Sequence, residues 1–272
     1  MPRKENKPVS FILSTGRTGT QFFSNYLNQT CEGLLCLHEP FPSRRFKWYS
    51  NFYLNGKLSK KFIARQYLAK RKSILRNERI DQYVESSNFL FGCVEPINET
   101  IEALKVIHIT RHPLTYTVSH LNKGFWSGVK GFTARHIPGW LESIDKEIKS
   151  SRDPIMILLA RWIYVNEVIS SYQNTNAYLS LRFEDIFDRK ASDPANELNR
   201  TRIFLGCAEL PGDQQQEWLK VTANKSTKDR STRWPFRKDH LDFIRNKGKD
   251  LLVKFNYTID DHYLKKDHEE MA

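Results

Sequence analysis

The chain has 272 residues, of which 39% are hydrophobic, 12% are aromatic and 27% are charged. This composition can bury a core and excludes a wholly disordered chain, while 12 Gly and 11 Pro are too few for a collagen-like or Gly/Pro-rich sequence. The formal net charge of +12 indicates an anionic partner: nucleic acid, a membrane surface, an acidic polysaccharide or a phosphorylated cofactor.

Five short apolar runs predict buried strands. In chain order they are Val9–Ser14, Gly33–Leu37, Tyr83–Glu85, Lys105–Thr110 and Ala177–Arg182. Helices are expected over Thr20–Asn28, from Pro113 onward and over Pro154–Tyr172, and the rest alternates helix and loop up to a polar tail at about 260–272. Strands that alternate with helices predict parallel βαβ units. We therefore expect one α/β domain over residues 1–272, with three layers (α/β/α) around a mainly parallel central sheet.

The cysteines and the apolar stretches predict the cellular compartment of the protein. The four cysteines are Cys31, Cys36, Cys93 and Cys207. They are too few and too scattered for a disulfide framework or a zinc ribbon, which indicates reduced thiols and no metal. The apolar stretch 9–13 is too short for a signal peptide, and the stretch 155–165 falls short of the ~20 residues that cross a bilayer. We expect a cytoplasmic protein that contacts a membrane at most peripherally, through its basic segment.

That basic segment covers about residues 41–79. It holds twelve Lys or Arg and a single acid, Glu78, and its aromatic side chains are interleaved with the cations. A charge run of this kind is often only a solvated helix face. The size of the surplus predicts instead a helical insertion that binds an anionic acceptor.

The segment Ser14-Thr-Gly-Arg-Thr-Gly-Thr-Gln21 lies between a predicted buried strand and a predicted helix. The unpaired N–H groups and partial positive charge of a helix N-terminus bind anions, and Gly16 and Gly19 let the backbone approach a ligand. Arg17 adds a permanent charge. The spacing of the two glycines and the missing Lys separate this loop from the Walker A motif of ATPases and GTPases.

A second cluster, Thr110-Arg-His-Pro113, lies where the fourth predicted strand ends and a helix begins. The carboxyl ends of parallel strands form the ligand-binding edge of such a sheet, so Arg111 is a candidate anion ligand. Ser119 lies inside the following helix, and a long arginine folded over that helix would be able to share an anion with its hydroxyl.

Together these segments resemble the PAPS-dependent sulfotransferases, and most of all the bacterial and carbohydrate sulfotransferases. The loop 14–21 is similar to that family's 5′-phosphosulfate loop, Arg111 and Ser119 are similar to its 3′-phosphate site, and Leu179–Ile186 resembles its late strand. The resemblance covers about residues 9–187. It implies a P-loop NTPase-like fold, with PAPS (3′-phosphoadenosine-5′-phosphosulfate) as donor, the bisphosphate PAP as product and no metal.

The resemblance also implies site residues. The 5′-phosphosulfate would be held by Gly16, Arg17, Thr18, Gly19, Thr20 and Gln21. The 3′-phosphate would be held by Arg111 and Ser119. Cations of the C-terminal loop would contact the adenosine, and the candidates are Lys228, Arg230, Arg233, Arg237 and Lys238. This loop departs from the pattern of the cytosolic members, so no one of these cations is singled out.

An acceptor hydroxyl needs a general base, because its own pKa is far too high. The candidates are Glu39, His38 and Glu85, beside Arg17 as the group that stabilises the leaving oxygen. Glu39 with Pro40 resembles the Glu-Pro pair of carbohydrate sulfotransferases, and the sequence around Glu85 resembles another glutamate motif of the family. His38 has the better intrinsic pKa.

We therefore expect an enzyme that transfers a sulfuryl group from PAPS to a hydroxyl or amine, with an anionic glycan or a lipid-linked sugar as the acceptor. Two alternatives remain at this point. A nucleotide or small-molecule kinase of the same fold predicts dependence on ATP and Mg²⁺. A nucleic-acid-binding protein without catalytic activity predicts strongly salt-dependent binding that ignores Arg111.

Overall fold

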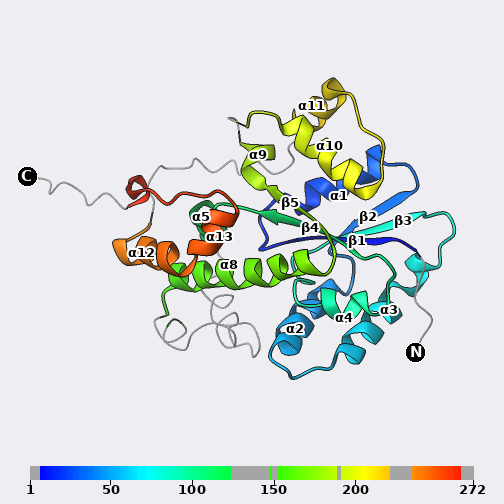
Figure 1. Cartoon of the computed structure of the whole chain (residues 1–272), viewed down its shortest axis with the longest axis horizontal. Helices are drawn as coiled ribbons and strands as arrows, with labels where there is room; N and C mark the ends of the chain where they lie inside the picture. Colours follow the sequence, from blue (N-terminus) through cyan, green and yellow to red (C-terminus); the bar gives the residue numbers. More distant parts are fainter. Residues whose placement is uncertain (1–6, 124–147, 149–151, 189–190, 221–234, 265–272) are drawn as a thin grey trace, which may run out of the picture. The chain divides into compact units, whose positions relative to one another are not determined.

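The described strands form one sheet, in which all five strands are parallel (Figure 1). The structure is a computed structural model that describes residues 7–123, 148, 152–188, 191–220 and 235–264. The strands are β1 (Val9–Ser14), β2 (Leu34–His38), β3 (Gln82–Ser86), β4 (Lys105–Thr110) and β5 (Ala177–Arg182), in the spatial order β2-β3-β1-β4-β5. β1, β4 and β5 have the predicted bounds. β2 begins and ends one residue later than predicted, and β3 begins one residue earlier and ends one residue later.

The chain divides into two compact units. The first unit is formed by Met1–Arg111 and Val165–Ala223, and the second by His112–Tyr164 and Asn224–Ala272. The first unit holds the whole sheet. That the two units act as one domain stays a prediction.

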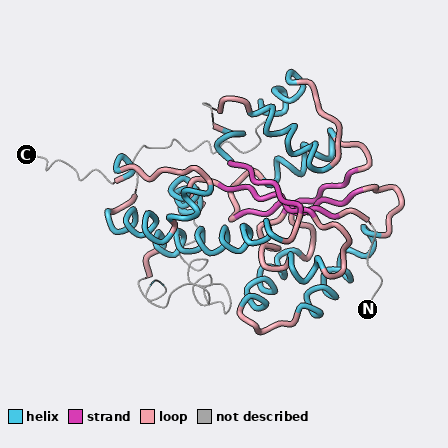
Figure 2. Tube along the Cα trace, in the orientation of Figure 1, coloured by secondary structure: helices cyan, strands magenta, loops and turns pink. Residues whose placement is uncertain are grey.

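Helices cover both faces of the sheet in the first unit (Figure 2). On one face lie α1 (Thr20–Thr30), α9 (Phe183–Phe187), α10 (Pro194–Leu205) and α11 (Gly212–Lys220). On the other lie α2 (Ser43–Leu54), α3 (Lys60–Leu75) and α4 (Val94–Asn98), and a short 3₁₀ helix, η1 (Tyr172–Asn174), precedes β5. This arrangement confirms the predicted three-layer α/β/α fold.

Strand alternation explains the two buried faces, because successive side chains of a strand point to opposite sides. Ile12 packs with Phe23 and Leu27 of α1, whereas its neighbour Phe11 makes an edge-to-face contact with Tyr67 of α3 at 5.6 Å. Both faces of β1 are therefore buried, and its centre, Phe11 to Leu13, is an unbroken hydrophobic run.

The second unit is helical. It contains α5 (Pro113–Leu121), α12 (Lys238–Lys247), α13 (Lys249–Lys254) and the 3₁₀ helix η2 (Asp261–Tyr263), and α8 (Pro154–Ser171) begins there and ends in the first unit. Its core packs around the fully buried Trp162, Tyr116 and Phe236. The described residues contain no helix with the length and apolarity that a membrane span requires.

The strand order creates a switch point at the carboxyl edge of the sheet. The chain leaves β1 toward β2 on one side, and it leaves β4 toward β5 on the other, while β1 and β4 are neighbours. Ligands of open parallel sheets bind in the crevice where connections diverge in this way. The loops after β1 and β4 are therefore the place to look for a site.

Candidate active site

The loop after β1 has the backbone that an anion site needs. Gly16 and Gly19 have φ values of 91° and 78°, and Arg17 between them has a φ of 61°, all in the left-handed region. The N–H of Gly16 donates to Ser14 Oγ at 3.0 Å, and Gly19, as the N-cap of α1, has no side chain to cap the first turn. The N–H groups at the start of α1 thus remain available to an anion.

Two hydroxyl groups of this loop are buried with no hydrogen-bond partner among the described residues. They belong to Thr15 and Thr18, which are 1% and 0% exposed. A buried hydroxyl without a partner destabilises the folded state, so an oxyanion bound here would satisfy both groups. The residues present therefore fit a phosphosulfate. Thr20 is also buried, and Gln21 is exposed on the first turn of α1.

Arg111, the first residue after β4, reaches this loop. Its Nη1 donates to the backbone oxygen of Arg17 at 2.6 Å, and its guanidinium carbon lies 4.3 Å from the centre of the Phe183 ring. Only 9% of Arg111 is exposed. The two arginines that the sequence singled out are thus brought together at the switch point, and burial lowers the pKa of Arg17 without removing its charge.

His38 and Glu39 end β2 at the same edge of the sheet. The N–H of Glu39 donates to the backbone oxygen of Ser86 at 3.0 Å, and Glu39 has a φ of 43°, which is unusual for a residue other than glycine. Burial raises the pKa of the Glu39 carboxyl, and the nearby charge of Arg44 opposes that rise. Burial lowers the pKa of His38, whose Nδ1 is buried without a hydrogen-bond partner among the described residues. Burial thus makes the Glu39 carboxylate more basic and favours the neutral imidazole of His38, which is the form that accepts a proton.

Glu85, the third base candidate, is fully buried in β3 and its carboxylate is already bound. Nη2 of Arg71 lies 2.7 Å from Oε1, Nε of Arg71 lies 2.8 Å from Oε2, and the Tyr83 hydroxyl donates to Oε2 at 2.9 Å. A carboxylate held in this way is not open to an acceptor molecule. The geometry favours Glu39 and His38 over Glu85.

The remaining predicted ligands lie in the second unit or outside the described residues. Ser119 is half-buried on α5. Arg237 is the N-cap residue of α12 and forms ion pairs with Asp153 at 2.9 Å and Asp239 at 2.8 Å, contacts that favour a structural role for its side chain. Lys238 is exposed at the first position of that helix. Lys228, Arg230 and Arg233 lie outside the described residues.

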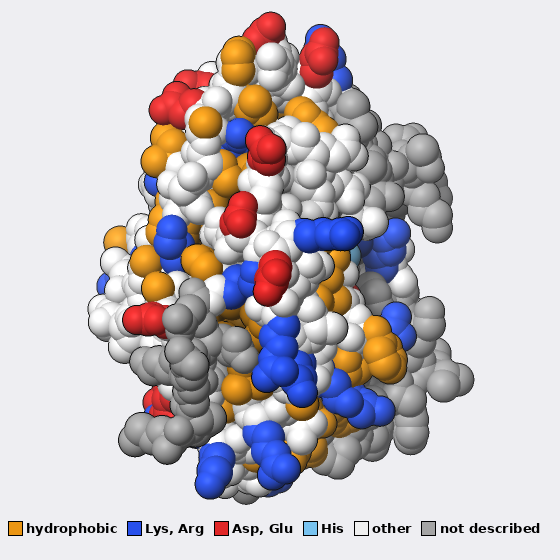
Figure 3. Space-filling view, turned by 90° about the vertical axis from the view of Figure 1, so that its right-hand side faces the viewer, with side chains coloured by type: hydrophobic (Ala, Val, Ile, Leu, Met, Phe, Trp, Pro, Cys, Tyr) orange, Lys and Arg blue, Asp and Glu red, His pale blue; other side chains and the backbone are white. Residues whose placement is uncertain are grey.

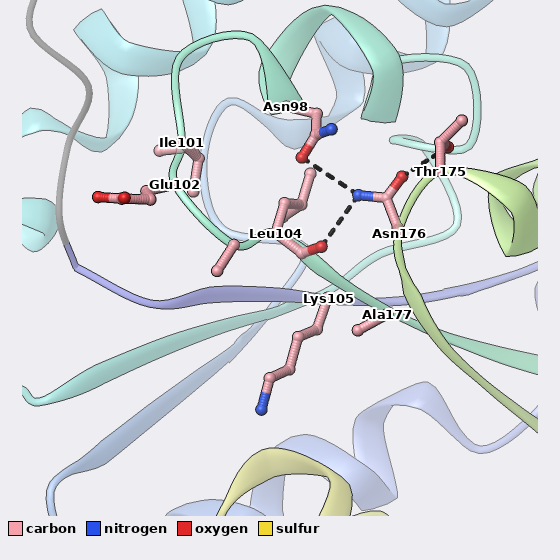
Figure 4. Close-up of a pocket in the computed structure, with 9 residues that line it drawn as sticks. Asn98, Ile101, Glu102, Leu104, Lys105, Thr175, Asn176 and Ala177 are labelled. Atoms are coloured by element: carbon pink, nitrogen blue, oxygen red, sulfur yellow. Dashed lines mark hydrogen bonds between the residues drawn. The ribbon is translucent and has the colours of Figure 1, made fainter.

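A separate hollow of about 320 Å³ lies at the opposite edge of the sheet, around the amino ends of β4 and β5 (Figure 4). Asn176 Nδ2 there donates to Asn98 Oδ1 at 3.2 Å and to the Leu104 backbone oxygen at 2.9 Å. The side-chain amide of Asn176 thus has its hydrogen-bond partners within the protein. In the loop after β1, by contrast, the Thr15 and Thr18 hydroxyls have none among the described residues. Among the described residues, no group of three or more His, Cys, Asp or Glu side chains is placed to hold a metal ion.

No family model and no curated protein matches the chain by sequence. Solved structures do match. A sulfotransferase domain from the curacin biosynthetic pathway has a TM-score of 0.57 at 14% identity, over 94% of this chain and 100% of that chain. The chain has the sulfotransferase fold.

Two further structures agree with the sulfotransferase fold. A sulfotransferase from Alicyclobacillus acidocaldarius has a TM-score of 0.54 at 13% identity, over 96% of this chain and 99% of that one. A sulfotransferase from Mycobacterium avium has a TM-score of 0.57 at 11% identity, over 95% of this chain and 79% of that one. The fold that the sequence resemblance predicted is therefore confirmed, and at such low identity the residues of the site have to be argued from this chain itself.

Proposed function

We propose that this protein is a sulfotransferase that transfers a sulfuryl group from PAPS to an acceptor hydroxyl or amine. The observation that carries the proposal is the contact between Arg111 and the Arg17 loop at the switch point of a sulfotransferase fold. Anion ligands from two adjacent strands at one edge suit a donor with a phosphate near each end of its adenosine.

Each loop is assigned one end of the donor. The N–H groups at the start of α1, with Arg17, Thr18 and Gln21, hold the 5′-phosphosulfate. Arg111 holds the 3′-phosphate, with Ser119 as its predicted partner. Arg111 is well suited to this task, because the ring of Phe183 supports its guanidinium and its bond to the Arg17 backbone fixes its position.

In this reaction no side chain of the protein has to form a covalent bond to the sulfuryl group. When bound, PAPS supplies a sulfur atom that is activated by its bond to a phosphate leaving group. The acceptor oxygen or nitrogen forms a bond to that sulfur, and the bond between sulfur and the bridging phosphate oxygen breaks with its electron pair on that oxygen. Arg17 and the N–H groups of α1 stabilise the charge that develops there.

Glu39 accepts the proton that the acceptor loses. Burial raises the pKa of Glu39, which makes it a stronger base than an exposed glutamate. The backbone strain at Glu39 is of the kind that gathers at functional sites. His38 is the second candidate for this role, because it lies beside Glu39 and its Nδ1 has no hydrogen-bond partner within the part of the chain that the structure describes.

For the acceptor we propose an anionic glycan, bound on the basic segment 41–79. The exposed cations of this segment lie on α2, on α3 and in the turns beside them, and they are Arg44, Arg45, Lys57, Lys61, Arg65, Lys70, Lys72, Arg76 and Arg79. Figure 3 shows one face on which Lys and Arg gather over the side of α2 and α3. Phe41, two residues after Glu39, is 90% exposed, and an exposed aromatic ring stacks well on a sugar.

Isothermal titration calorimetry with PAP, AMP and ATP tests the proposed donor. We expect PAP to bind most tightly without Mg²⁺, because only PAP offers phosphates to both loops. A preference for ATP that requires Mg²⁺ would favour a kinase. Equal binding of the three nucleotides, or no binding, would contradict the proposal.

A further inference from the structure

The Arg71–Glu85 ion pair is hydrogen-bonded to the turn that follows the proposed base. Arg71 of α3 and Glu85 of β3 are 1% and 0% exposed, and the guanidinium binds both carboxylate oxygens, at 2.7 and 2.8 Å. Although Arg71 belongs to the basic segment 41–79, it therefore contributes nothing to the exposed cationic surface.

The other donors of Arg71 go to the turn after Glu39. Nη1 donates to the Phe41 backbone oxygen at 3.2 Å, and Nη2 donates to the Pro40 backbone oxygen at 3.2 Å and to Ser43 Oγ at 3.0 Å. One buried guanidinium thus binds three groups within the four residues that follow Glu39. A strained residue such as Glu39 persists only where its surroundings fix it, and these contacts supply that constraint on its C-terminal side.

Glu85 in turn fixes Arg71. Its carboxylate also accepts hydrogen bonds from Ser43 Oγ at 3.2 Å and from the Tyr83 hydroxyl at 2.9 Å, so both of its oxygens are fully engaged. Burial would lower the pKa of Arg71, but the hydrogen bonds and the charge of Glu85 outweigh it and the pKa is raised. Arg71 therefore stays cationic, and its fork of donors stays in place.

Stability alone is a weak explanation for such a pair. A buried ion pair often stabilises a protein no more than apolar residues of similar volume, because both charges lose their hydration. The specific feature here is geometric, since a planar fork with five N–H donors is able to bind a carboxylate and backbone oxygens together.

We propose that Arg71 is a positioning residue for the reaction. It holds the turn from Glu39 to Ser43 so that the Glu39 carboxylate is presented at the carboxyl edge of the sheet, and Glu85 orients Arg71 for this task. The inference rests on the proposed function of Glu39 as the base.

The test compares a variant that breaks the ion pair with one that removes it. Arg71→Met leaves Glu85 buried and unpaired, so the unfolding midpoint of this variant should fall by roughly 10 °C. This variant serves only as a reference for stability. Arg71→Met/Glu85→Leu removes both charges and should unfold within a few degrees of the wild type. Lys249→Met, at an exposed position of α13 outside the basic segment 41–79, is the control and should leave every measured quantity unchanged.

Three quantities are measured on each variant: the affinity for PAP, the hydrogen exchange of the Glu39 and Ser43 amides, and the release of PAP from PAPS with chondroitin as acceptor. In the double variant we expect wild-type PAP affinity, amide exchange faster by about tenfold or more, and a lower kcat with an unchanged KM for PAPS.

Wild-type exchange of the two amides in the double variant would overturn the role of Arg71, whatever the donor proves to be. Failure of the wild-type protein to bind PAP would overturn the proposed function instead, and the exchange rates would still decide whether Arg71 holds the turn. The two failures are therefore distinguishable.

Discussion

At the scale of single residues, Glu39 carries the most specific chemical assignment. Glu39→Gln keeps the size of the side chain but removes the base, so we expect kcat to fall by about 10²–10⁴-fold while PAP affinity is kept. Because burial disfavours the ionised carboxylate, the variant should be at least as stable as the wild type at neutral pH. Steady-state release of PAP from PAPS and thermal unfolding measure the two effects.

The pH dependence gives an independent check of this assignment. The base has to be ionised, so the rate should fall as the pH decreases through the raised pKa of Glu39, and the midpoint of that fall should lie above the ordinary value of 4.5. Glu102→Gln, at an exposed position, is the control. A Glu39→Gln variant with near-native kcat would contradict the assignment and move the role to His38.

Thr18 offers a prediction in which stability and binding change in opposite directions. Its buried hydroxyl has no partner among the described residues, so Thr18→Val should leave the free energy of unfolding unchanged or raise it, and should weaken PAP binding. Thr117 is equally buried, but its hydroxyl donates to the Pro113 backbone oxygen at 2.8 Å. Thr117→Val should therefore destabilise the protein by about 1 kcal/mol.

Urea unfolding and calorimetry with PAP measure both threonine variants. If Thr18→Val loses stability as Thr117→Val does, then Thr18 has a structural partner in the free protein. That result would contradict its assignment to the donor.

At the scale of elements, the junction of β1 and α1 depends on Gly19. A Cβ atom at Gly19 would lie 2.7 Å from Cε2 of Phe187, and the φ of 78° is also strained for any residue with a Cβ. Gly56 has a φ of 70°, but a Cβ there meets nothing within 4 Å.

The two glycine variants separate strain from collision. Gly56→Ala should lose about 1–2 kcal/mol from backbone strain alone. Gly19→Ala should lose more than Gly56→Ala and should also bind PAP more weakly, because Phe187 or the loop has to move. Chemical unfolding of both variants measures the difference, and equal losses would show that the contact with Phe187 is unimportant.

The sequence predicts elements and loops better than it predicts side-chain partners. Short segments rich in apolar residues define β1, β4 and β5, and the strand-to-helix junctions place Arg17 and Arg111 at one edge of the sheet. By contrast, Arg71 is one of twelve cations in the segment 41–79, and nothing in its local pattern shows that it turns inward to Glu85. Contacts between residues far apart in the chain decide such partners.

At the scale of the whole molecule, the charge asymmetry should govern the choice of acceptor. The chain carries a formal net charge of +12, and the segment 41–79 exposes nine of its cations besides Lys60, which pairs with Glu95. We expect the KM for chondroitin, an anionic glycan, to rise steeply with salt, because screening weakens the attraction between exposed charges. Dextran is the neutral control, and equal salt dependence for both glycans would contradict an anionic acceptor.

The central claim is that the loops after β1 and β4 hold the two ends of one nucleotide. Calorimetry of the wild type and of Arg111→Ala, with PAP and with AMP, tests it most directly, and exposed Arg79→Ala is the control. Loss of one charge-assisted contact of about 1.5–3 kcal/mol should weaken PAP binding by about ten- to a hundredfold and change AMP binding little. An equal loss for PAP and AMP would contradict the claim.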